Sequence, residues 1–133
     1  MANILFDTGR EGILDRTIDM TSDIRVMLVP STYSFVASHK FVTDLAVTDN
    51  GRSASLTGMT YTSGAFDAND TTLLASAAVA CNALIVYDYS GDDSTSRLVA
   101  YIDTPTAGLP MTPAAGQTVN IAFDQTANKI FKL

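Results

Sequence analysis

Two β-forming segments separated by a polar turn constrain the fold of this chain more than any other feature. Residues 83–89 read ALIVYDY, residues 97–103 read RLVAYID, and the residues between them read SGDDSTS. β-branched and aromatic residues favour strands, whereas Gly, Asp and Ser favour turns. The pattern therefore predicts an antiparallel hairpin between Ala83 and Asp103. The first arm is apolar at consecutive positions, as is typical of a central strand covered on both faces.

Shorter β-forming stretches recur along the rest of the chain, separated by turn formers. We expect further strands at residues 23–30, 53–56, 59–62, 71–76, 118–123 and 130–133. Residues 3–15 predict one short helix, with Asn3 as its N-cap. Residues 31–49 predict a loop with one helical turn, and the prolines at 105, 110 and 113 predict a loop without a central strand.

Composition supports a mainly β chain. It has thirteen Asp against one Glu, with seventeen Thr and eleven Ser. Thr suits a pleated sheet, Asp and Ser suit turns, and the long straight side chains that decorate helix surfaces are scarce. The chain has 133 residues, which is a usual size for one domain, so residues 1–133 are expected to form a single domain. We therefore expect a single-domain antiparallel β-sandwich or barrel-like fold with one short N-terminal helix.

Charge excludes some partners. The formal net charge is −6, so the basic surface that nucleic acid requires is missing, and an anionic membrane is equally disfavoured. The uncharged stretch from Thr71 to Tyr87 is interrupted by polar residues and is expected to be sheet core. The N-terminal residues lack the cationic region of a secretory signal, and Cys81 is the only cysteine. We therefore expect synthesis in a reducing cytoplasm and no disulfide within the chain.

Catalytic patterns are weak. Asp7-Thr8-Gly9 matches the loop of aspartic proteases, whose two carboxylates share a proton on loops fed by hairpins. Six residues before Asp7 cannot build such a hairpin, so we assign Asp7 to a solvated helix face. The lone His39 is interpreted as a hydrogen-bonded residue and Cys81 as a buried, inert thiol. We therefore expect that the protein is not an enzyme.

Two Asp-rich loops have the first alternate-position spacing of a calcium loop. They are Asp88-x-Ser90-x-Asp92 and Asp67-x-Asn69-x-Thr71, but neither has glycine at the sixth place or glutamate at the twelfth. Turns stabilised by their own side chains explain both loops, and one histidine with one cysteine cannot complete a structural zinc site. We expect no metal and no cofactor.

Several segments resemble a family of small tailed-phage virion proteins encoded among head and tail genes. They are GREGILD from Gly9 with TID from Thr17, DIRVMLV from Asp23, SRLVAYIDT from Ser96, GLP from Gly108 and NKIFKL from Asn128. These segments cover both ends and the middle of the chain, whereas residues 31–80 match less well. The resemblance implies a structural role in the particle without catalysis. It carries no functional residues with it.

Three functions follow from these observations. The first is a head decoration or cement protein that binds across subunits of the phage major capsid protein or other virion proteins. It would act as a homo-oligomer, for example a trimer on a local threefold position, in virions assembled in the host cytoplasm. The second is a tail or head-to-tail connector component. The third is a carbohydrate or host-surface binding module that uses loops 90–96 and 105–116, or the tyrosines Tyr87 and Tyr89, which should share a strand face.

The chain termini and the proline loop are the candidate interfaces. Ordered apolar ends often dock on neighbours in assemblies, and proline lowers the cost of ordering a loop. The candidate interface residues are Ile4, Leu5, Phe6, Pro105, Leu109, Pro110, Phe131 and Leu133. Ordinary packing within the chain is the alternative for each of them. The apolar end of the chain, from Ile130, is expected to be held in a sheet.

Overall fold

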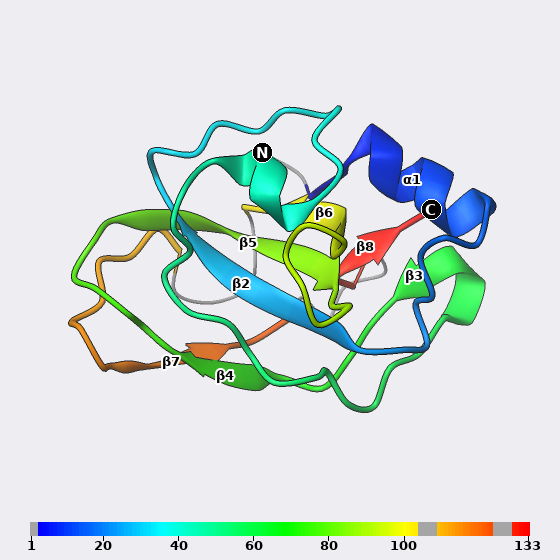
Figure 1. Ribbon diagram of the computed structural model, residues 1–133. Helices are drawn as coiled ribbons and strands as arrows, with labels where there is room; N and C mark the ends of the chain where they lie inside the picture. Colours follow the sequence, from blue (N-terminus) through cyan, green and yellow to red (C-terminus); the bar gives the residue numbers. More distant parts are fainter. Residues whose placement is uncertain (1–2, 104–108, 124–128) are drawn as a thin grey trace.

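A four-stranded antiparallel sheet forms the centre of the molecule (Figure 1). The computed structural model describes residues 3–103, 109–123 and 129–133. The order of strands across this sheet is β1-β6-β5-β2. Their bounds are β1 Ile4–Leu5, β2 Ile24–Pro30, β5 Cys81–Asp88 and β6 Arg97–Ile102.

The hairpin predicted between Ala83 and Asp103 is confirmed as β5 and β6. Leu84 lies opposite Ile102 and Ile85 lies opposite Tyr101. Strand β5 is central, with β6 on one side and β2 on the other, and Ala83 to Tyr87 are all buried. Its continuous apolar run is explained by this position, because alternate side chains point to opposite faces and both faces are covered.

Two small ladders pack against one face of the central sheet, with β4 and β7 below it and β3 and β8 to its right in Figure 1. Strand β3 (Ala65–Phe66) pairs with β8 (Phe131–Lys132), and β4 (Thr71–Leu74) pairs with β7 (Thr118–Ile121). A short 3₁₀ helix, η2 (Thr62–Gly64), precedes β3. The core between the layers contains Val26, Leu28, Leu84, Val86, Phe66, Leu73, Val119, Ile121 and Phe131. The expected anchoring of the C-terminal residues is therefore confirmed at β8.

The connection after β2 covers the other face of the central sheet. It contains the 3₁₀ helix η1 (Val42–Leu45), which confirms the expected loop with one helical turn. Val42 and Leu45 are buried in a second core with Tyr33, Met27 and Tyr87. The fold is thus mainly β with antiparallel sheets layered on each other, as expected, and the sheets are not closed into a barrel. No helix among the described residues is long and apolar enough to cross a membrane.

The N-terminal helix is present but shorter than predicted. Helix α1 spans Asp7–Leu14, and its N-cap is Phe6, without a side-chain cap. The predicted cap at Asn3 is wrong, because the Asn3 Nδ2 donates to the carbonyl of Ile130, 2.9 Å away. Ile4 and Leu5 are extended because they pair with Tyr101 and Ala100 of β6. Backbone pairing with a sheet edge therefore overrides the helical spacing of these residues.

Two of the predicted strands, at residues 53–56 and 59–62, do not form regular β-strands. Residues 53–56 run along the edge of β2 that faces away from β5, where Ser53 N donates to Val26 O at 2.9 Å and Leu56 N donates to Ile24 O at 2.7 Å. Residues 59–62 contribute only an isolated bridge at Thr60. Residues 59–62 read MTYT and contain strand formers, whereas residues 53–56 read SASL and contain none. In both segments too few consecutive backbone pairs form to make a ladder.

Candidate functional site

The residues singled out for catalysis do not meet at one site. Asp7 is exposed in the first turn of α1 and pairs with Arg10 at 3.4 Å. His39 Nδ1 is 3.0 Å from the hydroxyl of Tyr33. Cys81 is buried, as expected, and desolvation by burial raises the pKa of its thiol. A thiol held neutral in this way is a poor nucleophile.

Of the two Asp-rich loops, residues 90–96 contain a turn, as expected. Residues 67–71 do not form a turn: Thr60 N donates to Asp67 O and Asn69 N donates to Thr57 O, both at 2.9 Å. Asp92 Oδ1 accepts hydrogen bonds from the backbone N and the hydroxyl of Ser94, which lower the pKa of Asp92. Asp88 accepts from Asp19 N at 3.1 Å and from the hydroxyl of Ser22 at 3.0 Å. Within the part of the chain that the structure describes, no group of three or more His, Cys, Asp or Glu residues is arranged to hold a metal ion.

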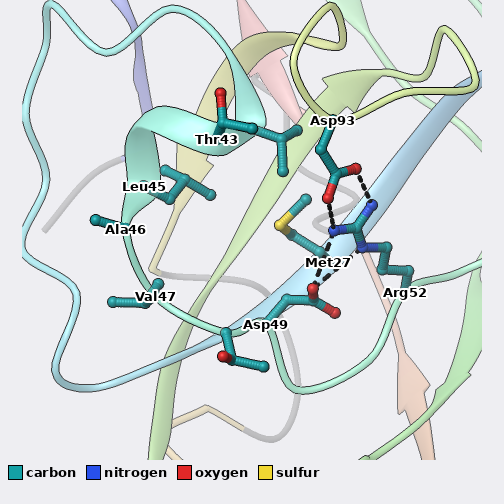
Figure 2. Close-up of a pocket in the computed structure, with 10 residues that line it drawn as sticks. Met27, Thr43, Leu45, Ala46, Val47, Asp49, Arg52 and Asp93 are labelled. Carbon is teal, nitrogen blue, oxygen red and sulfur yellow. Dashed lines mark hydrogen bonds and ion pairs between the residues drawn. The ribbon is translucent and has the colours of Figure 1, made fainter.

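A polar pocket of about 420 Å³ opens between η1, the 46–52 loop and the β5–β6 turn (Figure 2). We call it the Arg52 pocket. Figure 2 shows the Arg52 guanidinium between two carboxylates, with Met27 beside it. Arg52 binds both oxygens of Asp93, at 2.7 and 2.8 Å, and Asp49 Oδ1 at 3.0 and 3.2 Å.

The charged groups of the Arg52 pocket are satisfied by one another. Both oxygens of Asp93 accept from Arg52, and the second oxygen of Asp49 accepts from Gly51 N. The guanidinium also lies 5.6 Å from the ring centre of buried Tyr87, whose pKa is raised to about 12, mainly by burial. The arrangement ties the hairpin turn to the 46–52 loop. Its ionised groups therefore already have partners.

A second hollow is apolar and lies beside the C-terminal strand. This terminal groove has a volume of about 220 Å³. It is lined by Ile13, Met20, Tyr61, Gly64, Ala65, Phe66, Phe131 and Leu133. Its floor is aromatic, with the rings of Phe66 and Phe131 stacked at 5.3 Å. Tyr61 is fixed at the rim because its hydroxyl donates to Met20 O at 2.7 Å.

Two large apolar side chains of the terminal groove are uncovered. Leu133 is 64% exposed and Tyr61 is 47% exposed, and Leu14, which follows the groove residue Ile13 in sequence, is 84% exposed. Single exposed apolar residues are common on protein surfaces, but exposed apolar residues that line an apolar groove are typical of an interaction surface.

A third hollow, the Pro30 groove, lies at the other end of β2 and has a volume of about 400 Å³. Its lining is mostly small or apolar and comprises Pro30, Ser31, Thr32, Val47, Thr48, Asp49, Asn50, Ser76, Ala77, Val79 and Ala80. Val79 is 40% exposed, and Leu74, the last residue of β4, is 62% exposed. Met20, which lines the terminal groove, lies four residues before Ile24, the first residue of β2. Pro30, which lines the Pro30 groove, is the last residue of β2. The two apolar grooves therefore lie at opposite ends of one strand.

The eight candidate interface residues are distributed between core and surface. Leu5, Phe6 and Phe131 are buried within the chain, so their side chains stabilise the core. Ile4 and Leu109 are partly buried, Pro110 and Leu133 are exposed, and Pro105 lies outside the described residues. Of the eight, only Phe131 and Leu133 line the terminal groove.

Sequence reasoning missed most of the terminal groove. Ile13, Met20, Tyr61 and Phe66 come from segments far apart in the chain, and no spacing pattern connects them. One signal was present: the apolar pair Ile13-Leu14 at the end of an eight-residue helix, of which only Ile13 is partly buried. No family model, no curated protein and no solved structure matches the chain.

Proposed function

We propose that this chain is a non-enzymatic structural component of a tailed-phage virion, a head decoration or cement protein. The observation that carries the proposal is the pair of apolar grooves at opposite ends of β2. A rigid domain with one binding surface at each end is suited to bridging two neighbours in a lattice. The resemblance of the terminal and central segments to small phage virion proteins supports the same function.

The satisfied charges of the Arg52 pocket also favour a binding role over catalysis. A decoration protein needs affinity for adjoining capsid subunits and little affinity for a free subunit. Such binding stabilises the assembled shell by mass action, because the ligand binds only the assembled state.

Capsid binding tests this function. The recombinant protein is added to unexpanded and expanded heads of a tailed phage that encodes it, and bound protein is measured after sedimentation. We expect saturable binding to expanded heads and an increase in their melting temperature in calorimetry. Failure to bind any head form, or absence of the chain from purified particles, would contradict the proposal.

Copy number separates head decoration from the tail or connector alternative. Quantitative gel analysis of purified particles is expected to give a ratio to the major capsid protein close to that of a lattice-covering component. A ratio that corresponds to a single ring of copies would assign the chain to the connector or tail instead.

A further inference from the structure

The side chain of Asn50 fixes a loop that forms one wall of the Pro30 groove. Asn50 is 2% exposed, its Nδ2 donates to Ala77 O at 3.1 Å, and its Oδ1 accepts from Ala77 N at 2.8 Å. Residues 76–80, which we call the flap, lead into β5 and, apart from Ala78, line the groove together with Asn50. One buried side-chain amide therefore joins the flap to the 46–52 loop.

The flap depends on Asn50 because few other hydrogen bonds hold it. Ala77 is partly buried, and the other flap residues are exposed. Among the residues that the structure describes, the other bonds of the flap are Ser31 N to Ala80 O at 2.8 Å and Cys81 Sγ to Val79 O at 3.4 Å. Segments with exposed side chains and few hydrogen bonds open locally while the rest of a protein stays folded. Opening of the flap breaks both bonds between Asn50 and Ala77 and exposes the Asn50 amide to water.

The sequence at this position is chemically labile. Asn50 is followed by Gly51, and none of the other asparagines is followed by glycine. The backbone nitrogen of glycine reaches the side chain of a preceding asparagine most easily, because glycine has no Cβ to hinder the approach. The deprotonated nitrogen attacks Cγ, the Cγ–Nδ2 bond breaks, and ammonia leaves. Water then opens the resulting succinimide ring to aspartate or isoaspartate.

The folded structure blocks this reaction while the flap is closed. Ala77 holds both polar atoms of the Asn50 side chain, and the attacking atom, Gly51 N, donates instead to Asp49 Oδ2 at 3.2 Å. The fold also requires glycine at position 51, since its φ is +114° and a Cβ there would clash with Leu74 O. The labile pair therefore persists because the flap needs Asn50 and the backbone needs Gly51.

We infer that Asn50 is a conformationally gated deamidation site, inert beneath the closed flap and reactive when the flap opens. The aspartate product has no N–H to donate to Ala77 O or to Cys81 Sγ, both of which accept from Asn50 Nδ2. A buried carboxylate that faces a carbonyl oxygen is unfavourable, so the flap cannot close again over the product. Deamidation thereby removes one wall of the Pro30 groove. Its effect on a lattice contact rests on the proposed function, whereas the reaction itself does not.

Peptide mapping by mass spectrometry tests the reaction. The purified chain is kept at mildly alkaline pH, either folded or unfolded in urea, and conversion at Asn50 is followed over time. In the unfolded chain Asn50 should convert faster than every other asparagine. In the folded protein its conversion should be at least about tenfold slower, because a local opening must come first. Equal rates in the two states, or no conversion in the unfolded chain, would overturn the inference.

Urea concentrations below the unfolding transition separate opening of the flap from global unfolding. Local opening exposes little surface, so the conversion rate should stay nearly constant with urea until unfolding begins. In hydrogen exchange, the amide of Ala77 should exchange at least about tenfold faster than the amides of β5. A conversion rate that rises in step with the unfolded fraction would show that the flap is not the gate.

Asn50→Asp reproduces the product, and Asn120→Asp, at an exposed position of β7, is the matched control. Asn50→Asp should accelerate exchange at Ala77 at least about tenfold while the β5 amides stay protected, and should weaken binding to expanded heads. Asn120→Asp should change neither property. Unchanged exchange at Ala77 in Asn50→Asp would overturn the role of Asn50. If the variant does not fold, the wild-type time courses decide alone. Gated conversion in a protein that binds no heads would contradict only the proposed function.

Discussion

Gly9 shows how one small side chain permits the packing of α1 on the sheet. A Cβ at Gly9 would lie 2.5 Å from Val99 O and 3.1 Å from Leu98 O, both backbone atoms of β6. At an exposed helical position, replacing Gly with Ala stabilises a helix by up to about 1 kcal/mol. Here the close contact reverses the sign, because neither the helix nor the strand can move aside without losing its own hydrogen bonds.

We therefore expect Gly9→Ala to destabilise the protein by about 2 kcal/mol, in the range for overpacked sites. Urea unfolding followed by circular dichroism measures the change. Arg10→Ala on the exposed side of α1 is the control and should change stability by less than about 1 kcal/mol, since it removes an exposed ion pair with Asp7 and one long hydrogen bond to Leu5 O. A Gly9→Ala variant as stable as the wild type would contradict this packing.

Asp93 gives a pH-dependent prediction. Its hydrogen bonds with Arg52 lower the pKa of the carboxyl in the folded state. The resulting stability is complete above the unfolded pKa, about 3.9, and is lost as pH falls through the lowered folded value. Asp93→Asn should therefore be less stable than wild type at neutral pH, and the difference should shrink below about pH 4. Urea midpoints between about pH 7 and pH 2 measure it.

The contribution of Asp88 to stability should depend on pH in the opposite direction in the same experiment. Burial raises the pKa of Asp88 in the folded state, so its contribution to stability decreases as pH rises from the unfolded pKa through the raised folded value. The stability of Asp88→Asn relative to wild type should therefore improve with rising pH across that interval. If the stability difference from wild type changed with pH in the same direction for both variants, the opposite pKa shifts of Asp88 and Asp93 would be contradicted.

At the scale of elements, β8 fixes the end of the chain. Phe131 is 4% exposed and stacks on Phe66, whereas Leu133, two residues later, is 64% exposed. Phe131→Ala should cost about 3 kcal/mol, as for other buried aromatic side chains. Leu133→Ala is the matched control and should have almost no effect on the free energy of unfolding. Equal effects of the two substitutions would mean that β8 is not docked as described.

The same scale separates what sequence could predict from what it could not. The β5–β6 hairpin was predictable because its turn and both arms are local signals. The start of α1 was not, because Ile4 and Leu5 pair with β6, which lies far along the chain. Residues 53–56 read SASL and lack β-branched and aromatic side chains, and their hydrogen bonds with β2 depend on where the 46–52 loop returns. The terminal groove could not be predicted for the same reason, since its walls come from four separate segments.

At the scale of the whole molecule, the two grooves should be separable by mutation. Val79→Asp places a charge in the Pro30 groove, at a side chain that is 40% exposed, and should reduce binding to expanded heads without changing the free energy of unfolding by more than about 1 kcal/mol. Cosedimentation with heads measures the binding. Leu133→Asp is the complementary variant, since it places a charge in the terminal groove at a side chain that is 64% exposed. If Val79→Asp binds heads as wild type does, the Pro30 groove is not the lattice-facing surface.

Strand β2 lies between these two surfaces and is hydrogen-bonded along both edges. One edge pairs with β5, and on the other Leu28 N donates to Gly51 O at 2.9 Å while Asn50 N donates to Leu28 O at 2.7 Å. Bonds of an antiparallel ladder run perpendicular to the strands. Tension applied between the two ends would load these bonds in shear, all at once, instead of unzipping them one by one. In the proposed decoration role, tension between the two grooves would therefore act along the direction in which the hydrogen bonds of β2 resist together.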